Sequence, residues 1–202
     1  MATSDNKSPV IFTGENPGLS LVAAGSDRVV AAASFWHATY SLAGGGNALI
    51  IRYDGADGET TRAIYADNAA LGRFVTDTFT QHFGDFKDQG FASIDPTPAR
   101  FFQDAGSSRS HRVVCYSGER TIELVWSDVR DRQQLIGSQR VLGAHSYELA
   151  TVICPCGAAT ITIDDRPLSG EPRVRTGDGG RVSSSAFLAF AESWADNGPT
   201  GT

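Results

Sequence analysis

The stretch RVVAAASFWHATYSLAGGGNALIIRYD, residues 28–54, decides the fold class. Two apolar runs, 28–43 and 48–54, stand on either side of the glycine-rich segment GGGN at 44–47. A third run, TTRAIYA at 60–66, follows after another short turn. Apolar runs rich in aromatic and branched side chains, joined by short Gly-rich turns, are typical of β-hairpins. The stretch therefore predicts a meander of three antiparallel strands.

One segment departs from this β pattern. Residues 67–83, DNAALGRFVTDTFTQHF, begin with Asp67, and an aspartate often caps the first turn of a helix. Apolar residues then recur at the spacing of one helical face, at Leu71, Phe74, Val75, Phe79 and Phe83. We expect this amphipathic helix to pack on the sheet or to close one end of it.

Strand-like segments resume after the expected helix. They are FASI (91–94), ARFFQD (99–104), HRVVCYS (111–117), RTIELVWSD (120–128), SYELATVIC (146–154), ATITID (159–164) and SSSAFLAFAESW (183–194). About ten short strands separated by turns predict a closed barrel or a sandwich. The single helix favours an all-β, antiparallel barrel of about eight to ten strands, and a barrel of that size can hold one small ligand.

Length and composition narrow the class of protein. The chain of 202 residues suits a single domain, with polar tails at 1–8 and 196–202 that we expect to be disordered. A net charge of −6 without a basic cluster argues against nucleic-acid binding. The sequence has neither an apolar run long enough to span a bilayer nor the pattern of a signal peptide. We therefore expect a cytoplasmic protein without a membrane partner, and a homodimer stays open.

The tripeptide Cys154-Pro155-Cys156 is the obvious place for a metal or redox site. A structural zinc site usually takes two closely spaced pairs of ligands, and only one pair is present here. Redox-active cysteines usually stand as C-x-x-C at the start of a helix, which is not this context. Proline cannot donate to a β ladder, so Pro155 predicts a hairpin corner that ends the strand before it. We expect neither a metal nor a cofactor.

Two carboxylates fall on apolar faces of predicted strands. Alternation places Glu192 with Leu188 and Trp194, and it places Glu148 with Cys154. Burial would raise the pKa of such a carboxyl toward the value that a general acid or base needs near neutral pH. The alternative for each is a strand-end glutamate that reaches water or pairs with an arginine.

His37 lies in the middle of its strand, on a face that it shares with Phe35 and Thr39. This mixture of an aromatic ring and hydrogen-bonding groups resembles a cavity wall, and histidine exchanges protons near pH 7. A structural hydrogen bond is the alternative, and the other three histidines are expected at the surface. We predict His37, Glu148 and Glu192 as catalytic residues. The candidate substrate-binding aromatic residues are Trp36, Tyr40, Trp126 and Trp194, although the core is the favoured place for the three tryptophans.

The C-terminal third contains ATITIDDRPLSGEP (159–172) and GGRVSSSAFLAFAESWA (179–195). Their strand–turn–strand pattern resembles that of lipocalin-like β-barrel proteins of secondary metabolism. These include cyclases and hydratases that fold carotenoid, tocopherol or polyketide chains. The Gly-x-Trp signature near the N-terminus of true lipocalins is missing. The resemblance implies a class of fold and ligand, and it assigns no functional residue.

Taken together, these patterns predict an enzyme that needs no cofactor and acts on a bulky apolar small molecule in a barrel cavity. Cyclisation, isomerisation or dehydration with acid–base assistance are the reactions that such a cavity supports. The alternatives are a non-catalytic carrier of a lipophilic molecule and a β-sandwich interaction module. A cavity of several hundred Å³ would argue against the sandwich, and titratable groups at the cavity would favour the enzyme over the carrier.

Overall fold

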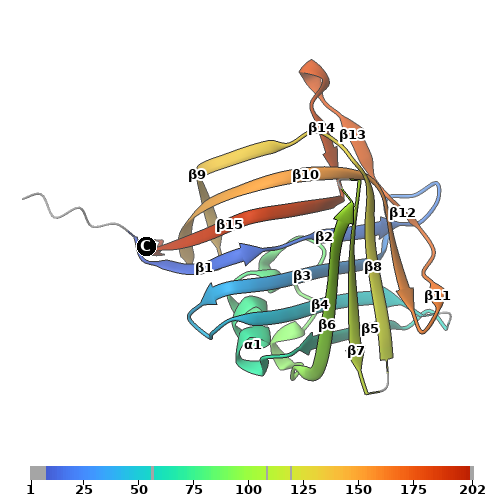
Figure 1. Ribbon diagram of the computed structural model, residues 1–202, viewed down its shortest axis with the longest axis horizontal. Helices are drawn as coiled ribbons and strands as arrows, with labels where there is room; N and C mark the ends of the chain where they lie inside the picture. Colours follow the sequence, from blue (N-terminus) through green and yellow to red (C-terminus); the bar gives the residue numbers. More distant parts are fainter. Residues whose placement is uncertain (1–7, 56, 108, 119, 201–202) are drawn as a thin grey trace, which may run out of the picture.

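The computed structural model describes residues 8–55, 57–107, 109–118 and 120–200, and most of them form β-strands (Figure 1). The strands are β1 (Val10–Glu15), β2 (Gly18–Val22), β3 (Val29–Ser41), β4 (Gly46–Asp54), β5 (Thr60–Ala66), β6 (Thr97–Ser107), β7 (Ser110–Ser117), β8 (Arg120–Val129), β9 (Gln133–Leu142), β10 (His145–Ile163), β11 (Arg166–Pro167), β12 (Glu171–Pro172), β13 (Val174–Thr176), β14 (Val182–Ser184) and β15 (Ala186–Pro199). One α-helix, α1 (Ala69–Thr78), and short 3-10 helices at Thr80–His82, Phe91–Ser93 and Asp178–Gly180 complete the described elements.

Nine strands of the large sheet close into a ring. The order runs from β1 through β3, β4, β5, β6, β7, β8 and β10 to β15, and β15 pairs again with β1. Every pairing in the ring is antiparallel except that of β5 with β6, which is parallel and joins two residue pairs. The predicted meander is confirmed, because β3, β4 and β5 pair in sequence order.

Several predicted elements differ from those observed. The sheet begins before residue 28, since β1 and β2 both pair with β3. Residues 91–94, expected as a strand, contain a 3-10 helix instead. At the other end, β15 continues to Pro199 and pairs with β10 where a disordered tail was expected from residue 196. Residues 1–7 and 201–202 of the expected tails lie outside the described part of the chain.

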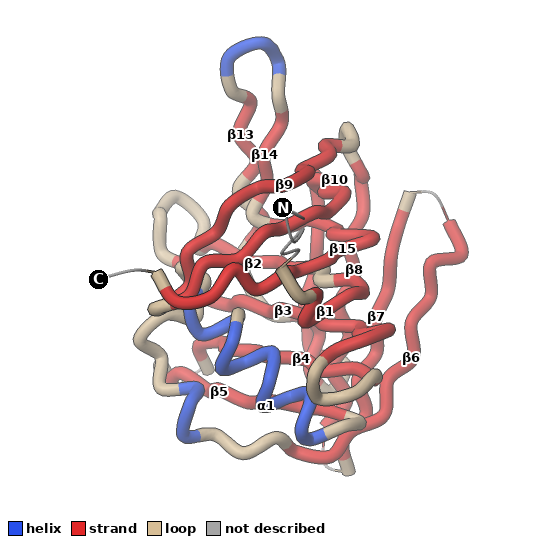
Figure 2. The backbone as a smooth tube through the Cα atoms, turned by 90° about the vertical axis from the view of Figure 1, so that its left-hand side faces the viewer, coloured by secondary structure: helices blue, strands red, loops and turns tan. Residues whose placement is uncertain are grey.

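The helix is shorter than predicted, and a neighbouring residue caps it. Asn68, rather than Asp67, accepts hydrogen bonds from the backbone N–H groups of Ala70 and Leu71 at 3.1 and 3.2 Å. The Asp67 carboxylate instead accepts from the backbone and side chain of Asn47, and so ties the start of the helix to β4. Figure 2 shows α1 lying across β4 and β5 on one face of the sheet.

Two hydrophobic clusters lie on opposite sides of the β3–β5 wall. The inner cluster lies inside the ring, because its members come from strands all around it, including Phe35, Ile51, Val113, Trp126, Ile161 and Leu188. The outer cluster lies between this wall and α1, and it includes Trp36, Ile50, Val75, Phe79, Leu149 and Trp194. Both faces of the wall are therefore buried, which explains why the sequence of β3 is apolar almost throughout.

The tripeptide Cys154-Pro155-Cys156 lies within one long strand, so the predicted hairpin corner is wrong. Up to Pro155, β10 pairs with β15, and from Cys156 onward it pairs with β8. The missing N–H of Pro155 falls where the strand changes partner, while its carbonyl oxygen accepts a 2.8 Å hydrogen bond from the N–H of Arg130. The strand thus changes its partner from β15 to β8 without a turn.

Candidate active site

A bulge in β15 determines which way the end of this strand points. Three steps along β15, from Phe190 to Ser193, correspond to two steps along β10, from Val152 to Ala150. The extra residue is Ala191, which has a φ of 50° in the left-handed region. A bulge of this kind reverses the alternation of the side chains that follow it.

Glu192 and Trp194 consequently face the outer cluster rather than the interior of the ring. Leu188, before the bulge, belongs to the inner cluster, whereas Trp194 belongs to the outer one. The prediction that Leu188 shares a face with Glu192 and Trp194 is therefore wrong, because the bulge at Ala191 interrupts the alternation.

The Glu192 side chain is buried and hydrogen-bonded, with an exposed fraction of 4%. The indole N–H of Trp194 donates a 2.6 Å hydrogen bond to Glu192 Oε1, and the side chains of Asn16 and Thr151 also form hydrogen bonds with the carboxyl. Burial disfavours the charged form and raises the pKa of Glu192 to about 7, while these hydrogen bonds act in the opposite direction. Near neutral pH the carboxyl can therefore both donate and accept a proton.

Glu192 borders a cavity with a volume of about 460 Å³. The cavity lies against the outer face of the ring, among residues of β2, β3, β9, β10, β15 and the segment 83–86. Most of its wall is apolar, with contributions from Leu19, Phe83, Phe86, Leu149, Ile153 and Phe187. The sequence predicts a ligand cavity inside the barrel, whereas this cavity lies outside the ring, and the inner cluster packs within the ring. A cavity of this size and character matches sites for small organic molecules.

Polar groups gather around Glu192 at the buried part of the cavity. Asn16, Ser34 and Thr151 line the same space, and all three are buried. Ser34 Oγ donates a 3.0 Å hydrogen bond to Asn16 Oδ1, which leaves the amide N–H₂ of Asn16 to face the carboxyl. The arrangement holds the carboxyl in one orientation beside an apolar space.

Residues 83–86 form another wall, which the sheet holds in place. Arg52 Nε donates a 2.7 Å hydrogen bond to the backbone oxygen of Asp85, and Ser20 Oγ donates to the carboxylate of the same residue. Asp85 therefore joins the segment to both β4 and β2. This wall is fixed through its backbone as well as through its side chains.

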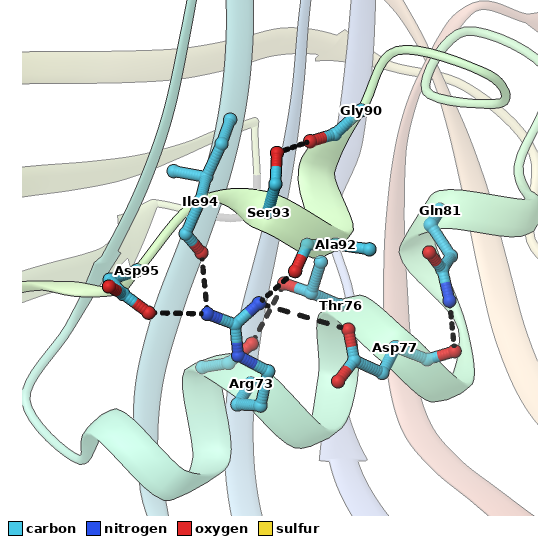
Figure 3. Close-up of polar contacts among 10 residues, drawn as sticks. Arg73, Thr76, Asp77, Gln81, Gly90, Ala92, Ser93, Ile94 and Asp95 are labelled. Carbon is cyan, nitrogen blue, oxygen red and sulfur yellow. Dashed lines mark hydrogen bonds and ion pairs between the residues drawn. The ribbon is translucent and has the colours of Figure 1, made fainter.

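The helix anchors the continuation of this segment. Arg73 of α1 donates hydrogen bonds to the backbone oxygens of Ala92 and Ile94 at 3.0 and 2.7 Å, and it pairs with Asp95 at 2.9 Å (Figure 3). Asp77, one turn along the helix, lies 4.0 Å from the same guanidinium group. The connection from α1 to β6 is thus held to the helix on one side and to the sheet on the other.

The other two predicted catalytic residues lie away from the cavity. His37 is half-buried, and its Nδ1 is 2.9 Å from Oδ1 of Asn47. Glu148 is exposed, while Leu149 and Thr151 on the opposite face of β10 line the cavity. The apolar surroundings predicted for Glu148 are wrong, because the inner cluster ends before it reaches this residue.

Among the predicted aromatic walls, only Trp194 borders the cavity. Trp36 is buried in the outer cluster and donates a 2.9 Å hydrogen bond to Thr80 Oγ1. Trp126 is buried in the inner cluster and donates a 3.0 Å hydrogen bond to the backbone oxygen of Gly18. Tyr40 is exposed. The alternative reading of these tryptophans as core residues therefore describes Trp36 and Trp126.

His111, expected at the surface, is buried, with an exposed fraction of 2%. Gln103 Nε2 donates a 2.7 Å hydrogen bond to Glu15 Oε2 and lies 3.3 Å from His111 Nε2. Burial lowers the pKa of His111, and the nearby carboxylates of Glu15 and Asp104 oppose this effect. Alternation in HRVVCYS, which puts His111 on the face of two apolar residues, is a signal that could have revealed its burial.

The three cysteines have the properties of buried thiols. Burial raises the pKa of Cys115 and of Cys156 to about 12, and it raises the pKa of Cys154 as well. In the ranges that the structure describes, no three His, Cys, Asp or Glu side chains lie together in a way that could hold a metal ion. None of the helices in those ranges has both the length and the apolar character needed to cross a membrane.

Comparison with known proteins finds no relative of this chain. No protein-family model, no curated protein and no solved structure matches the chain. The residues and the geometry of the cavity are consequently the basis on which a function can be inferred.

Proposed function

We propose that this protein is an enzyme that transfers a proton to or from a bulky, largely apolar small molecule bound in the cavity. The observation that carries the proposal is a buried carboxyl, Glu192, with a pKa raised to about 7 at the edge of an apolar cavity. A carrier of lipophilic molecules needs no titratable group at this place, whereas acid–base catalysis requires one.

In the proposed reaction, Glu192 acts in both protonation states. The acid form donates its proton to an oxygen or a double bond of the substrate, and the resulting carboxylate removes a proton from a neighbouring carbon. The glutamate returns to its starting state, so the net change is an isomerisation or cyclisation, or a dehydration when water leaves. Trp194 and Asn16 stabilise the carboxylate through their N–H groups.

The apolar wall supplies the remaining contribution. It binds the substrate by burial of apolar surface, and it holds the reacting carbon near the carboxyl, which favours the reaction through proximity. The proposal includes a lipocalin-like barrel as the architecture. The ring of nine strands supports this kinship, whereas the apolar cluster that packs inside the ring opposes it. No cofactor takes part in the proposed step.

The proposal is tested with an apolar metabolite extract from the organism that makes the protein. The wild-type protein should convert one component into a product of the same mass, or of a mass smaller by one water. Glu192→Gln should bind that component without converting it, and the exposed Glu148→Gln on the neighbouring strand should behave as wild type. If wild type and Glu192→Gln both retain a ligand and convert nothing, the carrier is the correct reading.

A further inference from the structure

Arg140 of β9 contributes a positive charge to the outer part of the same cavity. It lines the cavity together with Leu142 of the same strand, and unlike Glu192 it is exposed to solvent. Within the described ranges, its guanidinium group forms neither a hydrogen bond nor an ion pair. By contrast, Arg130 pairs with Asp128 at 2.5 Å and Arg173 pairs with Asp27 at 2.6 Å.

The cavity therefore has two polar regions separated by depth. The buried region holds Glu192 with its hydrogen-bonding neighbours, and the solvent-facing region holds the unpaired guanidinium of Arg140. Asp85 also borders the cavity, and its carboxylate accepts a hydrogen bond from the hydroxyl of Ser20. A guanidinium group binds a carboxylate through two parallel hydrogen bonds, a geometry that ammonium groups lack.

We infer that Arg140 binds a carboxylate at the outer end of the substrate, so that the substrate is an amphipathic acid whose apolar body extends toward Glu192. This inference rests on the proposed function, since it assigns the substrate class of the same cavity. Arg140 is a specificity residue in this arrangement, and it takes no part in the proton transfer.

The experiment uses N-phenyl-1-naphthylamine, an uncharged apolar dye whose fluorescence rises on binding, and displaces it with decanoate or with decanol. At a pH of about 6, decanoate is ionised, because aliphatic carboxylic acids titrate well below this value. Glu192 is largely neutral at the same pH, because its pKa of about 7 lies above it. We expect decanoate to displace the dye roughly fivefold more effectively than decanol from the wild-type protein.

Variants locate the effect. Arg140→Gln should abolish the preference for decanoate and leave displacement by decanol unchanged. Arg132→Gln, which removes an exposed arginine outside the cavity lining, should keep the preference. Asp85→Asn should increase the preference by removing a negative charge from the cavity wall.

The outcomes separate this inference from the proposed function. If the dye binds and both displacers act equally on the wild-type protein, or if Arg140→Gln keeps the preference, the assignment of Arg140 is wrong and the cavity stands. If the dye does not bind at all, the cavity is not a ligand site, and both proposals fall together.

Discussion

Trp194 Nε1 and Glu192 Oε1 are 2.6 Å apart, and the two residues stand two positions apart on β15, beyond the bulge at Ala191. The indole N–H stabilises the ionised carboxyl, whereas burial destabilises it. The pKa of about 7 is the balance of burial against this hydrogen bond and those of Asn16 and Thr151. A carboxyl in this condition affects the stability of the fold as well as its chemistry.

The free energy of unfolding should depend on pH through Glu192. Because the folded pKa of about 7 lies above the ordinary value of 4.5, the folded state binds more protons than the unfolded state between these values. Stability due to this group therefore falls as the pH rises from 4.5 to about 7, and it is then constant. The total loss is on the order of 3 kcal/mol. Glu192→Gln should remove this decline in urea unfolding measured across the pH range. A Glu148→Gln control, at an exposed position, should keep it.

Trp194→Phe should raise the pKa of Glu192 further. The variant removes a hydrogen bond that favours the carboxylate, and one such bond is worth about 1 kcal/mol, or somewhat less than one pH unit. The carboxyl ¹³C resonance of Glu192, assigned by its loss in Glu192→Gln, reports the titration directly. Trp36→Phe is the matched control, because its indole donates to Thr80 instead. An unchanged midpoint in Trp194→Phe would show that this hydrogen bond does not influence the carboxyl.

Ala191→Gly should stabilise the protein by up to about 1 kcal/mol, because alanine at a φ of 50° carries a steric cost that glycine does not. Ala191 is exposed, so little packing is lost. Ala189→Gly on the same strand is the control: Ala189 is buried and has no left-handed φ, so this change should destabilise the fold. Thermal unfolding of the two variants tests the pair, and destabilisation by both would refute strain at Ala191.

His111 should make the protein less stable in acid. Burial lowers the pKa of His111 below its ordinary value of 6.5, so the unfolded state binds more protons as the pH falls below 6.5. Stability due to this group is complete above 6.5 and is lost as the pH falls toward the folded pKa. His111→Gln should gain stability relative to wild type on acidification, and the exposed His145→Gln should not. Since Glu192 acts in the opposite direction over an overlapping range, the two variants are measured separately and together.

The local parts of the fold could be predicted from the sequence. GGGN between apolar runs predicts the hairpin of β3 and β4, and the spacing from Leu71 to Phe79 predicts a helix, because both signals depend on neighbours along the chain. The helix ends at Thr78, but the apolar spacing continues beyond it, because Phe79 also packs in the outer cluster. The predicted helix is therefore longer than the observed one.

The site could be predicted only in part, because its geometry depends on pairing between distant strands. Strict alternation predicts that Glu192 shares an apolar face with Leu188, and the bulge at Ala191 moves it to the other face. The bulge is visible only when β15 is aligned with β10. Pro155 likewise predicts a turn when β10 is considered alone, although it marks a change of partner. Residues 83–86 form a cavity wall through Asp85 and Arg52, and this contact leaves no periodic signal in the sequence.

The pairing of β1 with β15 sets the order in which the protein can be completed during synthesis. Residues 10–14 of β1 pair with residues 192–195, which leave the ribosome more than a hundred residues later. The second connection at this place, through β2, also needs β15. Until then, one side of β1 remains an open edge that can join another chain. A chain truncated before Ala186 lacks β15, so it should form an open sheet in which β1 and β10 each have an unpaired edge, rather than a smaller closed ring.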